Sequence, residues 1–185
     1  MFPYNNLTRD EAQILATRMN YKNSTSSLLF GIQWDLTLKF IEEKTVKNAN
    51  STDQETVRST IKNALTQKGK ELGNYYDNLW NITNQQAKYF MHSEKELGNC
   101  PKSKNSIGAI LLTTGADESF SLMNIYDLAG NVYEWTLEFY TDDRPCLGRG
   151  GYFYGYSSSC PANFRNNTEL TYSSSFFGFR ICIWK

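Results

Sequence analysis

Few side chains in this chain have the types and spacing that catalysis needs. His92 is the only histidine, which excludes histidine-based zinc clusters, Ser-His-Asp triads and facial triads. A cysteine nucleophile would have only His92 as its base, and that residue lies in a polar Met-His-Ser-Glu stretch. We therefore expect His92 to be a solvated surface side chain. The sequence also contains no P-loop and no GxGxxG motif.

Two carboxylates, Glu134 and Glu138, share one face of a predicted strand. At the rise of a strand they lie roughly 13 Å apart, which is too far for the two carboxyl groups of a glycosidase. We expect Glu134 to pair with an arginine or with backbone groups instead. Asp142 and Asp143 lie near Glu138 and could hold Ca²⁺, although we favour a turn with solvated acids. The sequence thus predicts no cofactor, with Ca²⁺ as the alternative.

Charge and hydropathy narrow the class of partner. The 19 basic and 19 acidic residues give a net charge of zero, and a phosphate-binding surface needs clustered positive charge, so we expect no nucleic-acid partner. No apolar run approaches the roughly 20 residues that span a bilayer, so we expect no membrane insertion. Residues 1–6 lack the basic and apolar regions of a secretory signal, and the compartment stays open.

The length of 185 residues fits one domain over 1–185 with a core of its own. Four cysteines permit two disulfides in one of three pairings, or four free thiols, and the sequence does not decide between these. They are widely spaced and form no CxxC motif: Cys100, Cys146, Cys160 and Cys182.

Three helices are predicted in the helical part of the chain, residues 1–70. Capping boxes at 8–11 and 52–55 open the first and the third, and a polar loop is expected at 20–27. The helices are expected to end near Met19, Glu43 and Gln67. In the first helix, the predicted buried face is Ala12, Leu15, Ala16 and Met19. In the second it is Ile32, Leu36 and Phe40, with Trp34 and Ile41 as further candidates. In the third it is Val57, Ile61 and Leu65.

The rest of the chain has strand signals. From Val132 to Tyr140 the side chains alternate with the period of a strand, and strands are also expected at 149–154 and 179–184. A short buried run occupies 110–112, whereas 69–105 is interpreted as loops with short elements. Helices first and strands last indicate an α+β domain with a small antiparallel sheet. Residues 106–185 would form the sheet and the ligand-binding loops.

Three linked motifs carry a resemblance to a known family. Asn-Ile-Tyr-Asp-Leu-Ala-Gly-Asn-Val-Tyr-Glu-Trp-Thr at 124–136 resembles the N-x-(Y/G)-D-(L/M)-x-G-N-V-(W/Y)-E-W segment of the formylglycine-generating-enzyme family, the sulfatase-modifying-factor domain. Arg-Gly-Gly at 149–151 is similar to its R-G-G-S strand, and Gly-Phe-Arg at 178–180 to its closing G-F-R. The resemblance covers nearly the whole chain. It implies a C-type-lectin-like fold with N-terminal helices and a small twisted antiparallel sheet.

Full-length members of that family begin with a β-rich segment before the first helix, so the resemblance leaves open whether this chain is a minimal member or a fragment. Its oxidases bind copper through two cysteines, at the fourth and ninth positions after the double glycine. Here the ninth is Cys160 but the fourth is Gly155, and one thiolate cannot make a two-sulfur site. A related sulfoxide-forming branch uses a histidine-rich iron site. The resemblance therefore implies the fold and not the activity.

A third branch fits the C-terminal segment better, namely the variable proteins of diversity-generating retroelements. In these proteins, adenine-directed mutagenesis rewrites codons of the C-terminal segment. Tyr offers a large contact area at low rotamer cost and Ser, Gly and Asn offer adaptable hydrogen bonds, as in antibody paratopes. The predicted ligand-binding residues, on loops of a rigid sheet, are Tyr152, Tyr154, Gly155, Tyr156, Ser157, Ser158, Asn163, Asn166, Asn167, Tyr172, Ser173 and Ser174.

The sequence thus predicts a non-enzymatic binding module, associated with a bacterium or its phage, for a protein or glycan on another cell or particle. One alternative is a copper-dependent oxidase of the formylglycine-generating type. The other is a structural fragment whose Tyr/Ser face packs on another subunit, and the oligomeric state is open. Arg165 and Arg180 are expected to be structural. The aromatic residues expected in the core are Phe153, Phe164, Phe179 and Trp184.

Overall fold

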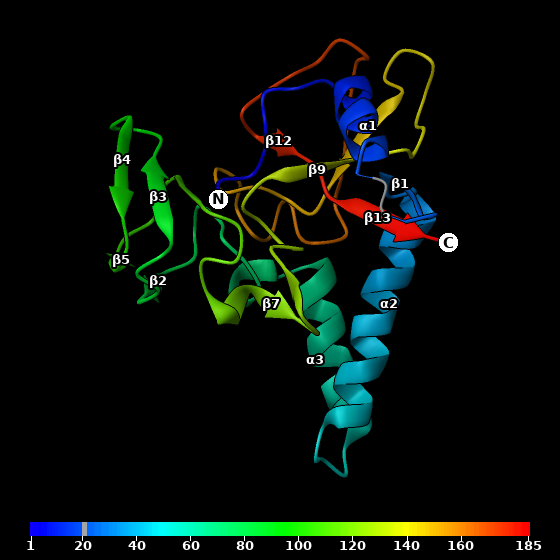
Figure 1. Ribbon diagram of the computed structural model, residues 1–185. Helices are drawn as coiled ribbons and strands as arrows, with labels where there is room; N and C mark the ends of the chain where they lie inside the picture. The colour runs from blue at the N-terminus through cyan, green and yellow to red at the C-terminus, as the bar shows by residue number, and fades with distance from the viewer. Residues whose placement is uncertain (20–21) are drawn as a thin grey trace.

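Helices occupy the first part of the chain and most strands the second, as predicted (Figure 1). The structure is a computed structural model that describes residues 1–19 and 22–185. Its α-helices are α1 (Arg9–Thr17), α2 (Gly31–Asn48) and α3 (Gln54–Thr66). Short strands form small, mainly antiparallel sheets, so the expected α+β class is confirmed. In the described part of the chain, no helix combines the length and the apolar character needed to cross a bilayer.

Helix α1 begins with the predicted capping box. The Thr8 hydroxyl accepts from the Glu11 amide at 3.3 Å, and the Glu11 carboxylate accepts from the Thr8 amide at 2.8 Å. Ala12 and Ala16 are fully buried, as expected, but Met19 lies beyond the end of the helix and is 57% exposed. The loop expected at 20–27 includes residues 20 and 21, which lie outside the described residues. Its later part is strand β1 (Thr25–Leu28).

Helix α2 buries a different face from the main one predicted. Ile32, Leu36 and Phe40 are exposed, whereas Trp34, Leu38 and Ile41 are buried. The indole of Trp34 donates a hydrogen bond to the carbonyl of Ala162 at 2.9 Å, so this face is the one held against the C-terminal segment. Both faces have apolar residues at helical spacing, and the periodicity of the sequence could not choose between them. The helix also continues five residues past its predicted end.

Helix α3 is a surface helix that packs along α2. Its N-cap is Asp53, one residue after the predicted Thr52, and the Asp53 carboxylate accepts from the Thr56 amide at 3.0 Å. Ile61 and Leu65 are buried, as predicted. Arg58 joins the two helices through salt bridges to Glu42 and Glu43 of α2.

The main sheet has four strands in the order β11-β10-β9-β12. They are β9 (Tyr133–Thr136), β10 (Cys146–Arg149), β11 (Arg165–Thr168) and β12 (Phe177–Gly178). Strands β9, β10 and β11 are antiparallel, and β12 is parallel to β9. The predicted strand at 132–140 is therefore shorter than expected. Strand β1 pairs separately with β13 (Ile181–Trp184), which falls within the strand predicted at 179–184.

The predicted strand at 149–154 is wrong beyond its first residue. Gly150 and Gly151 have positive φ values of 91° and 79°, a region that does not continue a pleated strand. A Cβ on Gly151 would lie 2.1 Å from the carbonyl oxygen of Cys160. The double glycine thus turns the chain out of the sheet, and the following residues form a loop.

The stretch at 69–105 contains more strand than expected. Its elements are η1 (Gly69–Glu71), β2 (Trp80–Ile82), β3 (Lys88–Met91), β4 (Glu96–Asn99) and β5 (Lys102–Lys104). Strand β6 (Ile110–Leu112), the predicted buried run, pairs with β3. After it come η2 (Glu118–Phe120), β7 (Ser121–Leu122) and β8 (Ile125–Tyr126). Strands of three or four residues without clear alternation leave little periodicity to detect. Ile82, Tyr89, Leu112 and Phe120 form a second, smaller core here.

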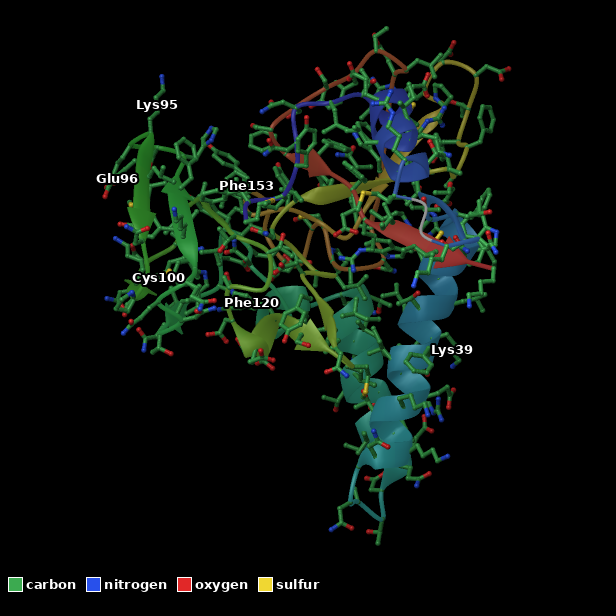
Figure 2. All side chains as sticks on the ribbon, viewed as in Figure 1. Lys39, Lys95, Glu96, Cys100, Phe120 and Phe153 are labelled. Carbon is green, nitrogen blue, oxygen red and sulfur yellow. The ribbon has the colours of Figure 1, made fainter. Side chains whose placement is uncertain are left out.

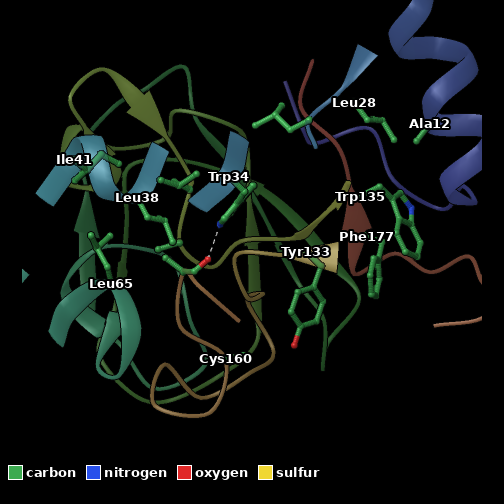
Figure 3. Close-up of a cluster of buried hydrophobic side chains, with 14 of the residues drawn as sticks. Ala12, Leu28, Trp34, Leu38, Ile41, Leu65, Tyr133, Trp135, Cys160 and Phe177 are labelled. Carbon is green, nitrogen blue, oxygen red and sulfur yellow. Dashed lines mark hydrogen bonds between the residues drawn. The ribbon is translucent and has the colours of Figure 1, made fainter. Parts of the chain in front are cut away.

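The main core lies between the helices and the four-stranded sheet (Figure 3). Trp135 stacks on Phe177 with ring centroids 4.3 Å apart, and its indole donates to the Leu7 carbonyl at 3.0 Å. Among the aromatic residues expected in the core, Phe153 is buried, Phe164 and Phe179 are partly buried, and Trp184 is 41% exposed. Trp184 was predicted wrongly because it lies in the two-stranded β1–β13 pair. Cys100, Cys146, Cys160 and Cys182 are free thiols.

Candidate functional site

The glycine and asparagine of the first motif shape the backbone beneath the candidate site. Asn131 donates from its amide to the Asn74 carbonyl at 2.8 Å, and Gly130 donates to the Gly150 carbonyl at 2.6 Å. Gly130 has φ of 72°, and a Cβ there would lie 2.3 Å from the Asn74 carbonyl oxygen. The side chains of Asn74 and Asn131 also hydrogen-bond each other at 3.2 Å. These residues hold three segments together that are distant in the sequence, around residues 74, 130 and 150.

Glu134, which is buried, and Arg180, which is half-buried, form an ion pair that links β9 to the closing motif. Both nitrogens Nε and Nη2 of Arg180 donate to the Glu134 carboxylate, and Nη2 also donates to the Tyr126 carbonyl at 3.1 Å. Burial lowers the pKa of Arg180, but the charge of Glu134 outweighs this and raises it. The guanidinium therefore stays protonated, and the expected structural role of the pair is confirmed.

Glu138 has separate partners. Its carboxylate accepts from Arg165 Nε at 2.7 Å and lies 3.5 Å from Arg149 Nε. Arg149 is fully buried and also binds Asp35 of α2. Arg165 is therefore structural, as expected. Glu134 and Glu138 therefore pair with different arginines, Glu134 with Arg180 and Glu138 with Arg165.

The residues at the copper position of the family do not fit that metal. A Cβ on Gly155 would lie 2.3 Å from Cys160 Sγ, so the two positions are adjacent, but only one carries sulfur. Cys160 is buried, its Sγ donates to the Tyr156 carbonyl at 3.2 Å, and burial raises the pKa of its thiol. Among the described residues, no group of three or more His, Cys, Asp or Glu side chains is placed to hold a metal ion.

The loop after the double glycine is fixed by contacts to a distant segment. The Tyr76 amide donates to the Gly155 carbonyl at 3.0 Å. The amide and the hydroxyl of Ser157 donate to the two carboxylate oxygens of Asp77, both at 2.9 Å. Lys104 Nζ donates to the carbonyls of Tyr75 and Tyr76 at 2.6 and 3.1 Å. Gly155 and Ser157 are thus buried and hold the loop, which corrects the expectation that they meet a ligand.

Exposure alternates along this loop. Tyr154, Tyr156 and Ser158 are exposed, whereas the residues that alternate with them, Phe153, Gly155 and Ser157, are buried. Tyr152 is half-buried and stacks on Tyr133 with centroids 4.6 Å apart. Phe153 fills the space between β9 and the β3–β6 strands, where Figure 2 labels it. The loop therefore presents alternate side chains from an anchored backbone.

The remaining predicted residues lie in two other places. Asn166 and Asn167 are half-buried on β11, at the edge of the main sheet opposite Gly148 and Leu147. Asn163 is half-buried just before that strand. The others, Tyr172, Ser173 and Ser174, precede β12. Tyr172 and Ser173 are exposed and Ser174 is half-buried.

The exposed tyrosines join rings from elsewhere in the chain. We define the ring cluster as Tyr76, His92, Tyr154, Tyr156 and Phe176. Tyr76 lies 5.9 Å from Tyr154 and 5.3 Å from Tyr156, measured between ring centroids. His92 lies 5.3 Å from Tyr154 and 5.6 Å from Phe176. The expectation that His92 is simply solvated is therefore wrong, because its half-buried ring packs against this cluster.

Tyr76 and His92 were missed as site residues because they come from the stretch with weak secondary-structure signals. The signal in the sequence that could have indicated them is the adjacent pair Tyr75-Tyr76. In the structure Tyr75 is fully buried and Tyr76 belongs to the cluster. The cluster contains no Lys, Arg, Asp or Glu, so it offers ring faces and hydroxyl groups. It can hold an uncharged part of a ligand by stacking and hydrogen bonding.

Comparison with known proteins identifies the fold. The family model for the sulfatase-modifying factor enzyme 1-like domain matches residues 21–185, which confirms the resemblance and with it the C-type-lectin-like fold class. Among solved structures, Treponema denticola variable protein 1 is similar, with a TM-score of 0.41 and 16% sequence identity. The match covers 85% of this chain and 47% of that one, so this chain spans about half of that protein's length. Comparison with curated proteins found no match.

Proposed function

We propose that this chain, which belongs to the sulfatase-modifying factor enzyme 1-like family, is a non-enzymatic module that binds a protein or glycan through the ring cluster. The observation that carries this proposal is the exposure of Tyr154 and Tyr156, at 46% and 50%, on a loop whose backbone is anchored on both sides. Large rings at a surface contribute most where their own conformation is already fixed. Here the hydrogen bonds at Gly155 and Ser157 fix the backbone that carries the two rings.

The alternation along the loop supports a variable surface of the diversity-generating-retroelement type. Substitution at Tyr154, Tyr156 or Ser158 would change the surface and leave the buried residues between them in place. A scaffold that tolerates such changes needs its anchors outside the variable segment, and here the carboxylate of Asp77 and the amide of Tyr76 supply them. We propose a partner on another cell or particle, in a bacterial or phage setting.

The oxidase alternative lacks the chemistry of its site. Gly155 offers no sulfur beside Cys160, and the single thiol is buried and protonated. A titration with Cu(I) tests this directly. Tight binding that disappears in the Cys160→Ser variant would overturn the non-enzymatic proposal, whereas we expect no difference between the two proteins.

The binding function itself can be tested by selection from a glycan array and a phage-displayed peptide library. We expect a selected ligand to lose binding to the Tyr154→Ala/Tyr156→Ala double variant. The matched control is Tyr140→Ala, because Tyr140 is 54% exposed and lies outside the cluster. Equal binding to the control and the double variant would contradict the proposed site.

A further inference from the structure

His92 is the member of the ring cluster whose charge can change near neutral pH. It is the only histidine of the chain, and imidazole side chains titrate between about pH 5 and about pH 8. Its backbone amide donates to the Ala109 carbonyl at 3.0 Å. Its half-buried ring lies 6.0 Å from Phe153, 5.3 Å from Tyr154 and 5.6 Å from Phe176, measured between centroids. The imidazole is therefore part of the surface that a ligand on Tyr154 meets.

The charged groups of the elements around His92 lie outside the ring cluster. Among the described residues, no ion pair includes His92. Strand β6, which follows Ala109, consists of Ile and Leu only. On the chain segment of His92 itself, Glu94 and Lys95 are exposed, and Figure 2 shows Lys95 pointing outward from the turn between β3 and β4. A positive charge on His92 is therefore stabilised by water and ring faces, without a carboxylate.

The charged groups beneath the cluster have their own partners. Lys104 donates to two backbone carbonyls, and Asp77 accepts from Ser157. The N-terminal segment packs near the cluster through Phe2, but Met1, which carries the amino group, is fully exposed. These groups hold the backbone of the site and offer no counter-charge to the imidazole.

We propose that the ring cluster binds an uncharged ligand tightly only while His92 is neutral, so that the complex dissociates as the pH falls below about 6. This inference rests on the proposed function of the cluster. A ligand that stacks on Tyr154 covers the imidazole and removes water from it, which disfavours the charged form. The rings of Phe153 and Phe176 contact His92 with or without a ligand, so their attraction for its charge does not replace the lost water.

Two other groups titrate in or near the same range. Burial raises the pKa of Asp127 to about 6 and lowers the pKa of Lys104 to about 8. The comparison is therefore made between about pH 5 and about pH 7, where Lys104 stays largely protonated. The variant Asp127→Asn separates the effect of that carboxyl group from the effect of His92.

Calorimetric titration with an uncharged peptide tests the proposal. The probe is a peptide with blocked ends, selected at about pH 7 from a phage-displayed library without side chains that titrate below about pH 9. For the natural chain we expect binding at least about tenfold weaker at about pH 5 than at about pH 7, because an ordinary imidazole is then almost fully protonated. Circular dichroism at both pH values shows whether each protein is folded.

The variants are compared by the ratio of their two dissociation constants, whatever their affinity. This ratio should stay within about twofold in His92→Phe, which keeps a ring and never becomes charged. His92→Gln, which is smaller and also uncharged, gives the same ratio without a bulky ring. Asp127→Asn is the control and should keep the ratio of the natural chain.

Proton NMR gives an independent readout, because the single histidine supplies a single set of imidazole signals. Saturation with the probe should lower the midpoint of their titration by at least about one pH unit, since binding of the neutral form shifts the equilibrium toward it. An unchanged midpoint, or equal affinity at both pH values, would overturn the inference. So would a pH-dependent ratio that persists in both His92 variants.

The failure of this inference differs from the failure of the proposed function. Binding that is independent of pH but is lost in the Tyr154→Ala/Tyr156→Ala variant overturns the role of His92 and leaves the ring cluster as the binding site. A library that yields no peptide dependent on Tyr154 and Tyr156 contradicts both.

Discussion

Asp127 should make this protein less stable as the pH rises from about 4 to about 6. Its side chain is 6% exposed, and Oδ2 accepts from the Gly115 amide at 2.9 Å. Oδ1 is buried without a hydrogen-bond partner among the described residues. Burial raises the pKa of Asp127 from 3.8 to about 6, and the charge of Glu134 adds to this effect against the opposing influence of Gly115 and Arg180.

The sign follows from proton binding. Between about pH 4 and pH 6 the folded chain holds a proton on Asp127 that the unfolded chain has lost, so raising the pH favours unfolding. Above about pH 6 the carboxylate of Asp127 is ionised in both states, and its burial then lowers the free energy of unfolding by the full amount. A shift of roughly two pH units corresponds to about 3 kcal/mol, of which about 2 to 3 kcal/mol develops between pH 4 and pH 7.

Asp127→Asn should remove this dependence. Asn is suited to the backbone here, because the φ of residue 127 is 53° and Asn tolerates the left-handed region. Urea unfolding followed by tryptophan fluorescence at several pH values gives the free energy of unfolding of both proteins. The difference between variant and natural chain should grow in favour of the variant by about 2 to 3 kcal/mol from pH 4 to pH 7.

The exposed Asp142→Asn serves as the control, and its difference from the natural chain should be flat over this range. A flat difference for Asp127→Asn as well would refute the reasoning, because it would mean that the buried carboxyl has an ordinary pKa. A difference that grows towards low pH would refute it more strongly, since that is the behaviour of a stabilised carboxylate.

Three further substitutions test the core, the loop and the Glu134–Arg180 pair. Trp135→Ala should lower the free energy of unfolding by about 3 to 5 kcal/mol, because it leaves a cavity beside a stacked ring; a loss below about 1 kcal/mol would contradict the packing. Replacing Tyr154, Tyr156 and Asn166 together with Ala should change the melting temperature by only a few degrees, and a drop above about 10 °C would show that they are core residues. Glu134→Gln should cost about 2 to 3 kcal/mol in urea unfolding, because the partly exposed guanidinium of Arg180 loses the carboxylate to which it donates; a neutral result would mean that the pair is not ionised.

The sequence predicted those parts of the fold that depend on local chemistry. The capping box at Thr8 and Glu11 was found because its two hydrogen bonds join residues three apart. The buried strand around Trp135 was found from its alternation and its motif. The outward face of α2 could not be predicted, because Leu36 and Leu38 belong to two apolar faces that are alike in sequence. Only the contact from Trp34 to the C-terminal segment distinguishes them.

The candidate site was predicted in part, for a similar reason. Composition identified Tyr154 and Tyr156, since a Tyr- and Ser-rich segment between two glycine motifs is visible in the sequence. It could not show that Ser157 turns inward to Asp77, which lies 80 residues earlier. It also could not show that Tyr76 joins the exposed tyrosines. These contacts depend on how the β2–β6 strands pack beside the main sheet.

The most direct test of the central claim is the dissociation constant of one selected ligand for three single variants. If the ring cluster is one site built from two distant segments, Tyr76→Ala and Tyr156→Ala should each weaken binding by at least about tenfold. Tyr140→Ala should bind like the natural chain. Unchanged affinity in Tyr76→Ala, with folding intact, would contradict the account, because the ligand would then be held without the half of the cluster that lies outside the C-terminal segment.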